Sequence, residues 1–565
     1  MRIAASLLLT SLLVACATST KTDDQGGQAM DNDKGAAAYL TAQENILKPL
    51  VTASNLAWYE ASVSGSDEDW TKSQAAEDAV NGFLADADRF ARVRALRDGG
   101  EITDPVVRRQ LEVIYLSMLG KQVDTSLLAQ ITAIGAELEK GFNTYRGEVA
   151  GKKLTTNEVE QILRGSTDSA ELQAAWEAQK GVGAVVAPKL KELVKLRNQV
   201  AKQLGFRDYY ALKLAERELE EDKLLALFDQ LDTLTRAPFL AHKAEVDRRL
   251  AKRLKLKPEQ LMPWHYQNPF FQEPPDVFDT GLDAIYKQAD TLELCRRFYG
   301  SIGMEVDDII QRSSLYEKEG KTPHAFAADI DREGDIRVLA NIVPGQQWQS
   351  TMVHELGHAV YDKYIDHKLP WTLRKATHPL TTEGLAMMLD RLVGNPRWAE
   401  ALGLIDAAQR DKITPEAEAF LAFAPLQFSR WTQVMLRFER ELYRDPDQDL
   451  DTLWWDMVEK YQGLKRPPGR EAPDYASKIH LVVAPVYYHN YMLGELFSAQ
   501  VHETIAAQGG KPAGETIYFG DASVGQLIID KVIRPGALYR WDELTRRVTG
   551  RELGPEAFAR RFTGE

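Results

Sequence analysis

Cysteine is nearly absent from this sequence of 565 residues, which contains only Cys16 and Cys295. Two cysteines allow at most one disulfide, and none inside the folded protein if Cys16 is modified. The composition, with 44% hydrophobic and 27% charged residues, is that of a globular protein with a sizeable core. We therefore expect packing, and not cross-linking, to stabilise the fold.

Long hydrophobic runs and an excess of positive charge are also missing. After the first residues, no apolar run approaches the roughly 20 residues that a membrane-spanning helix requires. The chain carries 69 basic and 83 acidic residues, a formal net charge of −14. Nucleic-acid binding relies on positive charge that pairs with phosphates, so we expect no nucleic-acid partner.

The first 15 residues have the pattern of a secretory signal peptide. Arg2 supplies a positive start, residues 3–14 are mostly apolar, and small residues follow. The segment Leu13-Val14-Ala15-Cys16 resembles a bacterial lipobox, in which cleavage before Cys16 leaves a thiol for lipid attachment. An ordinary cleaved signal with an incidental cysteine is the alternative.

Residues 16–35 are expected to form a flexible tether behind the lipidated Cys16. The segment is rich in Thr, Ser, Asp, Gly and Gln and has almost nothing to bury. Residues 36–565 then form one large domain that a lipid holds at a membrane. By resemblance to known lipoproteins, Ala17 after the cysteine favours the outer membrane of a bacterial envelope, with the domain outside the cytoplasm.

Apolar residues recur at spacings of three and four over long windows from about residue 36 onward. This period predicts amphipathic helices and a mainly helical protein. One β-hairpin is expected, because residues 325–329 and 336–342 flank the turn-like sequence of residues 331–334. Such a strand can bind an extended peptide as an added strand; the alternative is a hairpin without a role in binding.

His354, Glu355 and His358 form the sequence His-Glu-Leu-Gly-His. Histidines four positions apart on a helix project from one face, a spacing suited to two ligands of a tetrahedral zinc ion. Glu355 lies beside them and can act as the general base that activates water. Chance would produce the pattern on the order of 0.01 times in such a chain, which disfavours a surface helix with unrelated histidines.

A catalytic zinc site needs a third protein ligand, and Glu383 is the best candidate. It lies 25 residues after His358, in the otherwise mostly apolar segment 381–388. A lone carboxylate on an apolar face needs a partner such as a metal ion. The alternative for Glu383 is a helix cap or a salt bridge. His367 and His378 are interpreted as solvated loop residues.

These motifs resemble the peptidyl-dipeptidase A family, the angiotensin-converting-enzyme-like zinc peptidases that belong to the gluzincins. The similarity covers most of residues 40–565. It implies a large helical domain divided into two lobes by a deep cleft, with the zinc helix on the cleft floor and a small β-hairpin beside it. The segments that carry it are residues 354–388, with 368–375 in the middle, 168–172 with Trp176, 204–208, Trp454-Trp455 and 461–464.

The resemblance also implies roles for residues outside the metal motif. His480 and Tyr491 match a histidine and a tyrosine that stabilise the transition state, in which negative charge develops on an oxygen. Without the resemblance, such an aromatic cluster is more often core packing. The residues implied in substrate binding are Lys478, Tyr488 and Gln267 for a C-terminal carboxylate, and His324, Ala325 and Ala327 for the substrate backbone.

Two positions depart from the family's pattern. Met387 stands where the family has an aspartate that orients a zinc-binding histidine, so this support is expected to be missing. Asn490 stands where chloride-dependent members have an arginine. Chloride therefore remains a possible second ligand, but one anion site is expected to be absent.

We therefore predict a metallopeptidase with one zinc ion per chain and peptides as substrates. If the carboxylate clamp lies two residues beyond the zinc, the enzyme releases C-terminal dipeptides. The first alternative is a related helical zinc oligopeptidase or carboxypeptidase. The second is a non-catalytic, lipid-anchored binding protein, for which Met387 is the best support.

Overall fold

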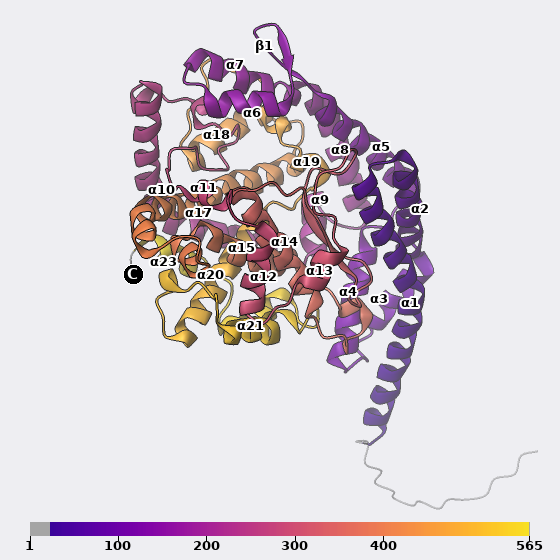
Figure 1. Ribbon diagram of the computed structural model, residues 1–565. Coiled ribbons are helices and arrows are strands. Elements are labelled where there is room, and N and C mark those ends of the chain that lie inside the picture. The colour runs from indigo at the N-terminus through magenta and orange to yellow at the C-terminus, as the bar shows by residue number, and fades with distance from the viewer. Residues whose placement is uncertain (1–22, 564–565) are drawn as a thin grey trace, which may run out of the picture.

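The computed structural model describes residues 23–563, and helices dominate it, as the sequence predicts (Figure 1). The elements before the zinc motif are α1 (Asp23–Ser64), α2 (Asp67–Leu84), α3 (Ala87–Asp98), α4 (Pro105–Leu119), α5 (Thr125–Thr144), β1 (Gly147–Val149), β2 (Lys152–Leu154), α6 (Thr156–Gly165), α7 (Ser169–Lys180), α8 (Val182–Gln203), α9 (Tyr209–Glu216), α10 (Glu221–Leu254), α11 (Leu282–Tyr286), α12 (Thr291–Ser301), α13 (Asp307–Arg312), β3 (Phe326–Asp329) and β4 (Ile336–Leu339). The elements from the zinc motif onward are α14 (Gln346–Lys363), α15 (Pro379–Asp390), α16 (Pro396–Ala401), α17 (Ala407–Arg444), α18 (Leu450–Gln462), α19 (His480–Val483), α20 (His489–Gly509), α21 (Ala522–Ile528), α22 (Trp541–Thr549) and α23 (Glu556–Thr563).

Helix α1 begins at Asp23, inside the segment 16–35 that was predicted to be a flexible tether. The part of α1 that precedes residue 36 already makes tertiary contacts. Asp33 accepts hydrogen bonds from the backbone N–H of Thr103 at 2.8 Å and from its hydroxyl at 2.6 Å. Helix α1 thus extends into the predicted tether, and the boundary at residue 35 stays a prediction. Cys16 and the predicted signal peptide lie outside the described residues.

The predicted hairpin is confirmed as the antiparallel pair β3 and β4, in which Phe326 pairs with Leu339 and Asp329 with Ile336. Leu339 of β4 also forms a parallel bridge to Ser314, so β3 is the edge strand. A second hairpin, β1 and β2, lies at the top of Figure 1. Its strands are too short for an alternating apolar pattern to predict them.

Helix α14, which carries the zinc motif, is oriented by one apolar face. Met352, Val353 and Leu356 are fully buried on that face, while His354 and His358 are partly exposed. Each buried side chain of this size contributes about 1.5–3 kcal/mol relative to an exposed one. The apolar face therefore fixes the rotation of the helix and directs the two histidines away from the core.

Helix α15 packs directly on both α14 and α20 near the centre of the molecule (Figure 1). Small residues permit this close approach. A Cβ atom at Gly357 of α14 would lie 2.9 Å from Ala386 Cα of α15, and a Cβ at Gly384 would lie 2.8 Å from the carbonyl oxygen of Gly494 in α20. The three helices thus bring residues that are distant in sequence to one site.

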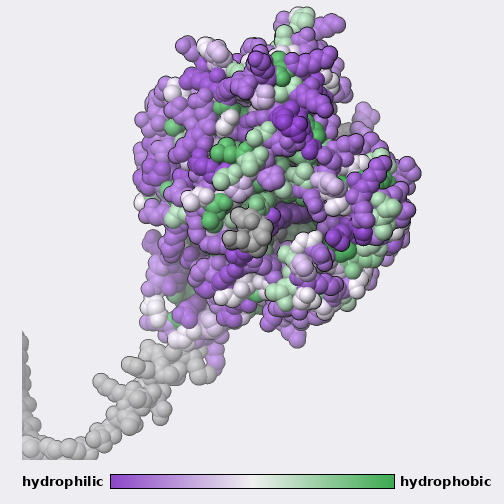
Figure 2. Space-filling view, turned by 90° about the vertical axis from the view of Figure 1, so that its left-hand side faces the viewer, coloured by the Kyte–Doolittle hydropathy of each residue, from purple (hydrophilic) through white to green (hydrophobic). Residues whose placement is uncertain are grey.

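The face of the molecule in Figure 2 is mostly hydrophilic, with hydrophobic residues in small groups. Among the helices of residues 23–563, none has the length and apolar character needed to cross a bilayer. Cys295 is fully buried as a free thiol and accepts a hydrogen bond from Gln349. Packing therefore stabilises this part of the chain, as the scarcity of cysteine predicts.

Candidate active site

His354 and His358 of α14 and Glu383 of α15 converge on one point. The Nε2 atoms of the histidines lie 3.1 Å apart, and Glu383 Oε2 lies 3.6 Å from His354 Nε2 and 3.8 Å from His358 Nε2. A tetrahedral zinc ion with bonds of about 2.0–2.1 Å holds its ligand atoms roughly 3.3 Å apart. The structure thus brings the three predicted ligands together at distances that fit one such ion.

The Nδ1 nitrogen of each histidine also has a hydrogen-bond partner. His354 Nδ1 lies 2.7 Å from Asp390 Oδ2, and His358 Nδ1 lies 2.7 Å from Thr382 Oγ1. Such hydrogen bonds orient a ligand imidazole and direct its Nε2 atom toward the metal. Asp390 therefore provides the support that was expected to be missing because of Met387.

Asp390 could have been found from helical spacing. It lies seven positions after Glu383, and residues seven apart share a face of a helix. Met387, four positions after Glu383, lies on the same face but packs toward α20, where its Cε would be 2.7 Å from a Cβ added at Gly494. Spacing alone allows either position, and the packing of α15 against α20 selects Asp390.

Glu355 is buried beside the two histidines. Burial, helped by the negative charge of Glu383, raises the pKa of Glu355 to about 7 against the opposing influence of His354. The backbone of Ala327 also forms a hydrogen bond with this carboxylate. A carboxylate with a pKa near neutrality is well matched to accept and return a proton at physiological pH.

Glu383 is kept ionised in spite of its burial. Burial acts to raise its pKa, but the hydrogen bond from His354 and the charges of both histidines hold the pKa below its ordinary value. The hydroxyl of Tyr487 donates to Glu383 Oε1 at 3.3 Å, while Oε2 is the oxygen near the histidines. Tyr487 is thus a further site residue to which the resemblance assigned no role.

Tyr491 lies beside Tyr487, and the His480 ring lies 5.1 Å from that of Tyr488. The Tyr491 ring is 5.4 Å from that of Tyr487, and burial with the charge of Glu383 raises the Tyr491 pKa to about 12. Its phenol therefore stays protonated and can donate a hydrogen bond. Burial lowers the pKa of His480 to about 4, so this imidazole is neutral, and its buried Nδ1 has no partner among the described residues.

Lys478, Tyr488 and Gln272 form a second cluster beside Tyr491, whose ring is 5.3 Å from that of Tyr488. Gln272 Oε1 accepts hydrogen bonds from Lys478 Nζ at 2.7 Å and from the Tyr488 hydroxyl at 3.2 Å. Burial lowers the pKa of Lys478 to about 8. Because a neutral amide holds the ammonium, a carboxylate from a ligand would meet an unneutralised charge.

Gln267, which was predicted to join this cluster, lies elsewhere. Its Nε2 donates to the carbonyl oxygen of Arg164 at 3.1 Å, and its Oε1 accepts from the backbone N–H of Asp276 at 2.6 Å. Gln272 takes the predicted place. Both glutamines belong to an irregular segment without a periodic pattern, so the sequence alone does not tell which one points inward.

The predicted substrate-backbone residues lie at the start of β3. His324 is exposed, Ala325 and Ala327 are partly exposed, and the charge of His324 contributes to lowering the pKa of His480. β3 packs on α14 and is the edge strand of its sheet. An edge strand offers backbone N–H and C=O groups to which an extended peptide can pair.

Comparisons with known proteins bear on this arrangement. The model of the M2 peptidase family, described as angiotensin-converting enzyme, matches residues 30–253 and 262–562 of the chain. The chain belongs to the angiotensin-converting enzyme family. The resemblance seen in the sequence motifs is thereby confirmed.

Individual members of the angiotensin-converting enzyme family match at low identity. The enzyme of Rattus norvegicus is 26% identical over 435 residues, which are 70% of this chain and 32% of the rat protein. The enzyme of Mus musculus is 25% identical over 484 residues, or 78% and 36%. The chain thus spans about a third of these mammalian relatives. The enzyme of Haematobia irritans exigua is 24% identical, and the match covers 72% of each chain.

The structure also shows the surroundings of Asn490 and His378, for which the sequence of this angiotensin-converting enzyme relative made predictions. Asn490 is fully buried at the start of α20, and neither amide atom has a hydrogen-bond partner among the described residues. Weak dependence on chloride stays a prediction. His378 is not a solvated loop residue: it is 3% exposed and accepts a hydrogen bond from Leu380 N as the N-cap of α15, where Pro379 starts the helix.

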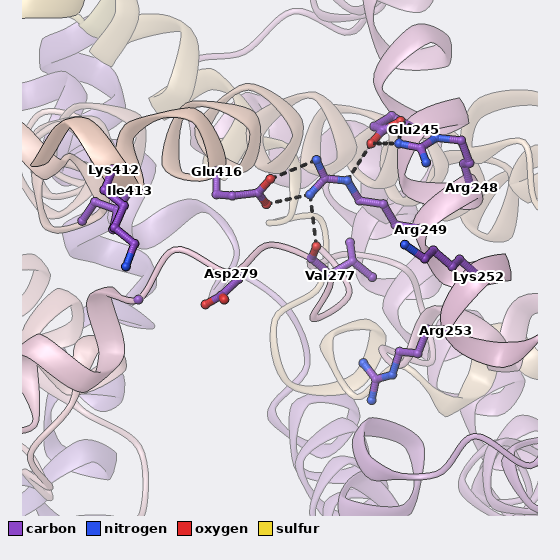
Figure 3. Close-up of a pocket in the computed structure, with 11 residues that line it drawn as sticks. Glu245, Arg248, Arg249, Lys252, Arg253, Val277, Asp279, Lys412, Ile413 and Glu416 are labelled. Atoms are coloured by element: carbon purple, nitrogen blue, oxygen red, sulfur yellow. Dashed lines mark hydrogen bonds and ion pairs between the residues drawn. The ribbon is translucent and has the colours of Figure 1, made fainter. Parts of the chain in front are cut away.

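A hollow of about 900 Å³ between α10 and α17 contains none of these site residues (Figure 3). Arg249 pairs there with Glu416 at 2.6 Å and with Glu245 at 2.7 Å. Arg249 therefore largely neutralises the carboxylates of Glu245 and Glu416. The residues that line the hollow include no separate set of metal-binding or nucleophilic groups.

Proposed function

We propose that this protein is a zinc-dependent peptidase that releases dipeptides from the C-terminus of oligopeptides. One observation carries the proposal. The ligand set His354, His358 and Glu383 lies near a lysine, Lys478, that a neutral amide holds and that forms no ion pair with a carboxylate among residues 23–563. This combination provides both a metal centre and a site for the free end of a peptide.

Two imidazoles and one carboxylate favour zinc over magnesium or calcium, which prefer oxygen ligands. Bound zinc would polarise the scissile carbonyl and lower the pKa of water. The support that Asp390 and Thr382 give to the histidines is consistent with a structured metal site.

The residues of the chain have distinct tasks in this proposal. Glu355 takes a proton from the attacking water and delivers it to the leaving amine nitrogen, for which a pKa of about 7 is well matched. The neutral phenol of Tyr491 and the neutral imidazole of His480 donate hydrogen bonds to the oxygen on which negative charge develops.

Lys478 and Tyr488, held by Gln272, bind the C-terminal carboxylate of the peptide and so set the distance to the cleaved bond. A clamp two residues beyond the metal yields dipeptides. The same chemistry with another distance gives a carboxypeptidase, and without a clamp it gives an endopeptidase. The binding-protein alternative has lost its best support, since Asp390 compensates for Met387.

The test combines metal content, turnover and product analysis. The purified protein should contain about one zinc ion per chain, and Glu355→Gln should keep the metal while losing nearly all turnover. Mass spectrometry of digests of peptides with free C-termini should identify dipeptides as the released product. Release of single residues, or internal cleavage, would contradict the dipeptidase assignment, and equal loss of zinc and activity in Glu355→Gln would contradict the division of roles.

A further inference from the structure

The segment 480–488 connects a residue proposed for catalysis with one proposed for the carboxylate clamp. It consists of the single helical turn α19, which begins at His480, and an irregular stretch that ends at Tyr487 and Tyr488, just before α20. The hydroxyls of the two tyrosines point to different partners. The conformation of this short connection therefore decides where three side chains of the site point.

The end of α19 lacks the backbone donors that a longer helix would supply. In a regular helix, each carbonyl oxygen accepts a hydrogen bond from the N–H four positions later. The position that corresponds to Leu481 is Pro485, which has no N–H. The position that corresponds to Val482 is Val486, and its N–H donates instead to Glu439 Oε1 at 2.7 Å. The two carbonyl groups thus need donors from outside the helix.

Arg197 of α8 provides both donors. Its guanidinium donates to the carbonyl oxygen of Leu481 at 3.1 Å and to that of Val482 at 2.7 Å. A third hydrogen bond, to the hydroxyl of Tyr443 at 3.2 Å, orients the guanidinium from the other side. Arg197 is buried, and a hydrogen bond from a charged donor is stronger than one between neutral groups. The contact therefore fixes α19 and, with it, the position of His480.

Val486 has a backbone conformation that a β-branched residue rarely adopts. Its φ of +54° lies in the left-handed region, where such a residue is found only if surrounding contacts impose it. Glu439 of α17 accepts from its N–H, and Arg217 donates to its carbonyl oxygen. Charged side chains therefore hold both polar groups of this peptide turn, and Tyr487 follows from it in a fixed direction.

Glu439 and Arg197 act on the site only through this segment. Among residues 23–563, neither forms a hydrogen bond or an ion pair with the proposed zinc ligands or with the clamp. Burial raises the pKa of Glu439 to about 7, and the N–H of Val486 and the charges of Arg197 and Arg217 oppose that rise. The contact with Val486 thus favours the ionised carboxylate, which is the stronger acceptor.

We propose that Arg197 and Glu439 are positioning residues of the active site. Arg197 fixes the turn that carries His480, and Glu439 fixes the left-handed turn at Val486 that directs Tyr487 and Tyr488. The consequence for catalysis rests on the proposed peptidase function, whereas the control of the segment does not.

Amide hydrogen exchange of residues 481–488 tests whether the two side chains hold the segment. Arg197→Met and Glu439→Met should each speed this exchange about tenfold or more, whereas Glu439→Gln keeps an acceptor oxygen and should stay close to the wild type. Gln433→Met is the matched control, because it removes a buried hydrogen bond of α17 to the carbonyl oxygen of Phe228, at 2.6 Å, and should leave the segment unchanged. Unchanged exchange in either Arg197→Met or Glu439→Met would overturn the proposal.

Arg197→Lys covers the case in which Arg197→Met does not fold. Lysine keeps the charge but lacks the planar fork that matches two carbonyl groups, so exchange of residues 481–488 should still rise. Exchange equal to that of the wild type in Arg197→Lys would overturn the role of the guanidinium.

Double-mutant cycles test the consequence for the reaction. Arg197→Met should lower kcat about tenfold, but it should cause no further loss in His480→Ala, because the residue that it positions is absent. Glu439→Met should lower the preference for a free over an amidated C-terminus about tenfold, but not in Tyr488→Phe. A purely structural role would reduce these values by the same factor in both backgrounds, and that outcome would overturn the positioning roles.

Zinc affinity provides a readout that does not depend on peptide hydrolysis. Glu439→Met should weaken zinc binding while Tyr487 is present and should have no further effect in Tyr487→Phe, since the Tyr487 hydroxyl donates to Glu383. Equal weakening in both backgrounds would overturn the action of Glu439 through Tyr487. A wild-type protein without turnover would refute the peptidase assignment, and the exchange and zinc measurements would still decide whether Arg197 and Glu439 position the segment.

Discussion

The two histidines of the metal centre have unlike partners. Asp390 presents a carboxylate to Nδ1 of His354, whereas Thr382 presents a hydroxyl to Nδ1 of His358. A carboxylate raises the basicity of a ligand imidazole more than a hydroxyl does, because it stabilises positive charge on the ring. The two rings should therefore contribute unequally to metal affinity.

Asp390→Asn tests this difference. The substitution keeps the shape of the side chain and removes its charge, so zinc affinity should fall about 10- to 100-fold. Competition with a chelator of known affinity measures the change. Thr382→Val is the comparison and should cost less, since it removes a neutral hydrogen bond. An Asp390→Asn enzyme with the zinc affinity of the wild type would show that Asp390 does not support the metal.

Tyr491→Phe tests whether the phenol acts in catalysis or only packs. The ring and most of its contacts are retained, so a purely structural residue would show nearly normal kinetics. A hydroxyl that stabilises developing charge should lower kcat about 100-fold on its loss, with little change in KM and in bound zinc. A kcat within about threefold of the wild type, less than roughly 1 kcal/mol, would assign Tyr491 to the core and direct attention to His480.

Tyr487→Phe is the informative contrast, because the Tyr487 hydroxyl donates to a proposed metal ligand, Glu383. Its loss should weaken zinc binding, while kcat at saturating zinc stays close to that of the wild type. The two tyrosines lie four positions apart on either side of the start of α20, so a shared structural disturbance would affect both variants alike. Opposite patterns in metal content and kcat would separate the two roles.

At the scale of elements, the close contact between α15 and α20 assembles the site. Gly384 and Gly494 allow backbone contact, and this places the tyrosines at the start of α20 beside Glu383. Larger side chains at either glycine would force the helices apart. The irregular segment between α10 and α11 brings Gln272 to Lys478 and Tyr488, so three separate parts of the chain form the clamp.

The clamp predicts a dependence on the free C-terminus of the substrate. Amidation should reduce kcat/KM at least about tenfold, because Lys478 would lose a charged partner. Gln272→Met should raise KM for the free peptide, since it removes the oxygen that holds both Lys478 and Tyr488. Gln267→Met is the matched control and should leave KM nearly unchanged. Indifference to amidation would refute the clamp, and a larger effect at Gln267 would refute the assignment of Gln272.

At the scale of the whole molecule, we propose that a lipid on Cys16 holds the peptidase domain at a bacterial membrane. The proposal rests on the lipobox-like sequence at the start of the chain. The body that begins at α1 has its own core, so its folding should not depend on the anchor.

Cys16→Ser should release an active enzyme of unchanged thermal stability into the soluble fraction. Fractionation of cells, with peptidase activity measured in each fraction, checks the outcome. Persistence of the Cys16→Ser protein in the membrane fraction would contradict lipid attachment at this residue. Release of an inactive or unstable protein would instead contradict the independence of the domain from its anchor.

The sequence by itself determined the features that depend on local spacing. The separation of His354 and His358 places both on one helix face, and the alternating segments around residues 331–334 form the hairpin that they predict. Glu383 stood out because its surroundings are apolar. In each case the signal lies within a few turns of one element, where helical or strand geometry relates neighbouring residues directly.

Only the tertiary structure decided between residues that local geometry treats alike. Asp390 rather than Met387 supports His354, and Gln272 rather than Gln267 joins Lys478, because packing between distant segments orients those side chains. The contacts of a side chain with distant residues, and the burial that changes its pKa, depend on how elements pack, which the period of a sequence does not encode.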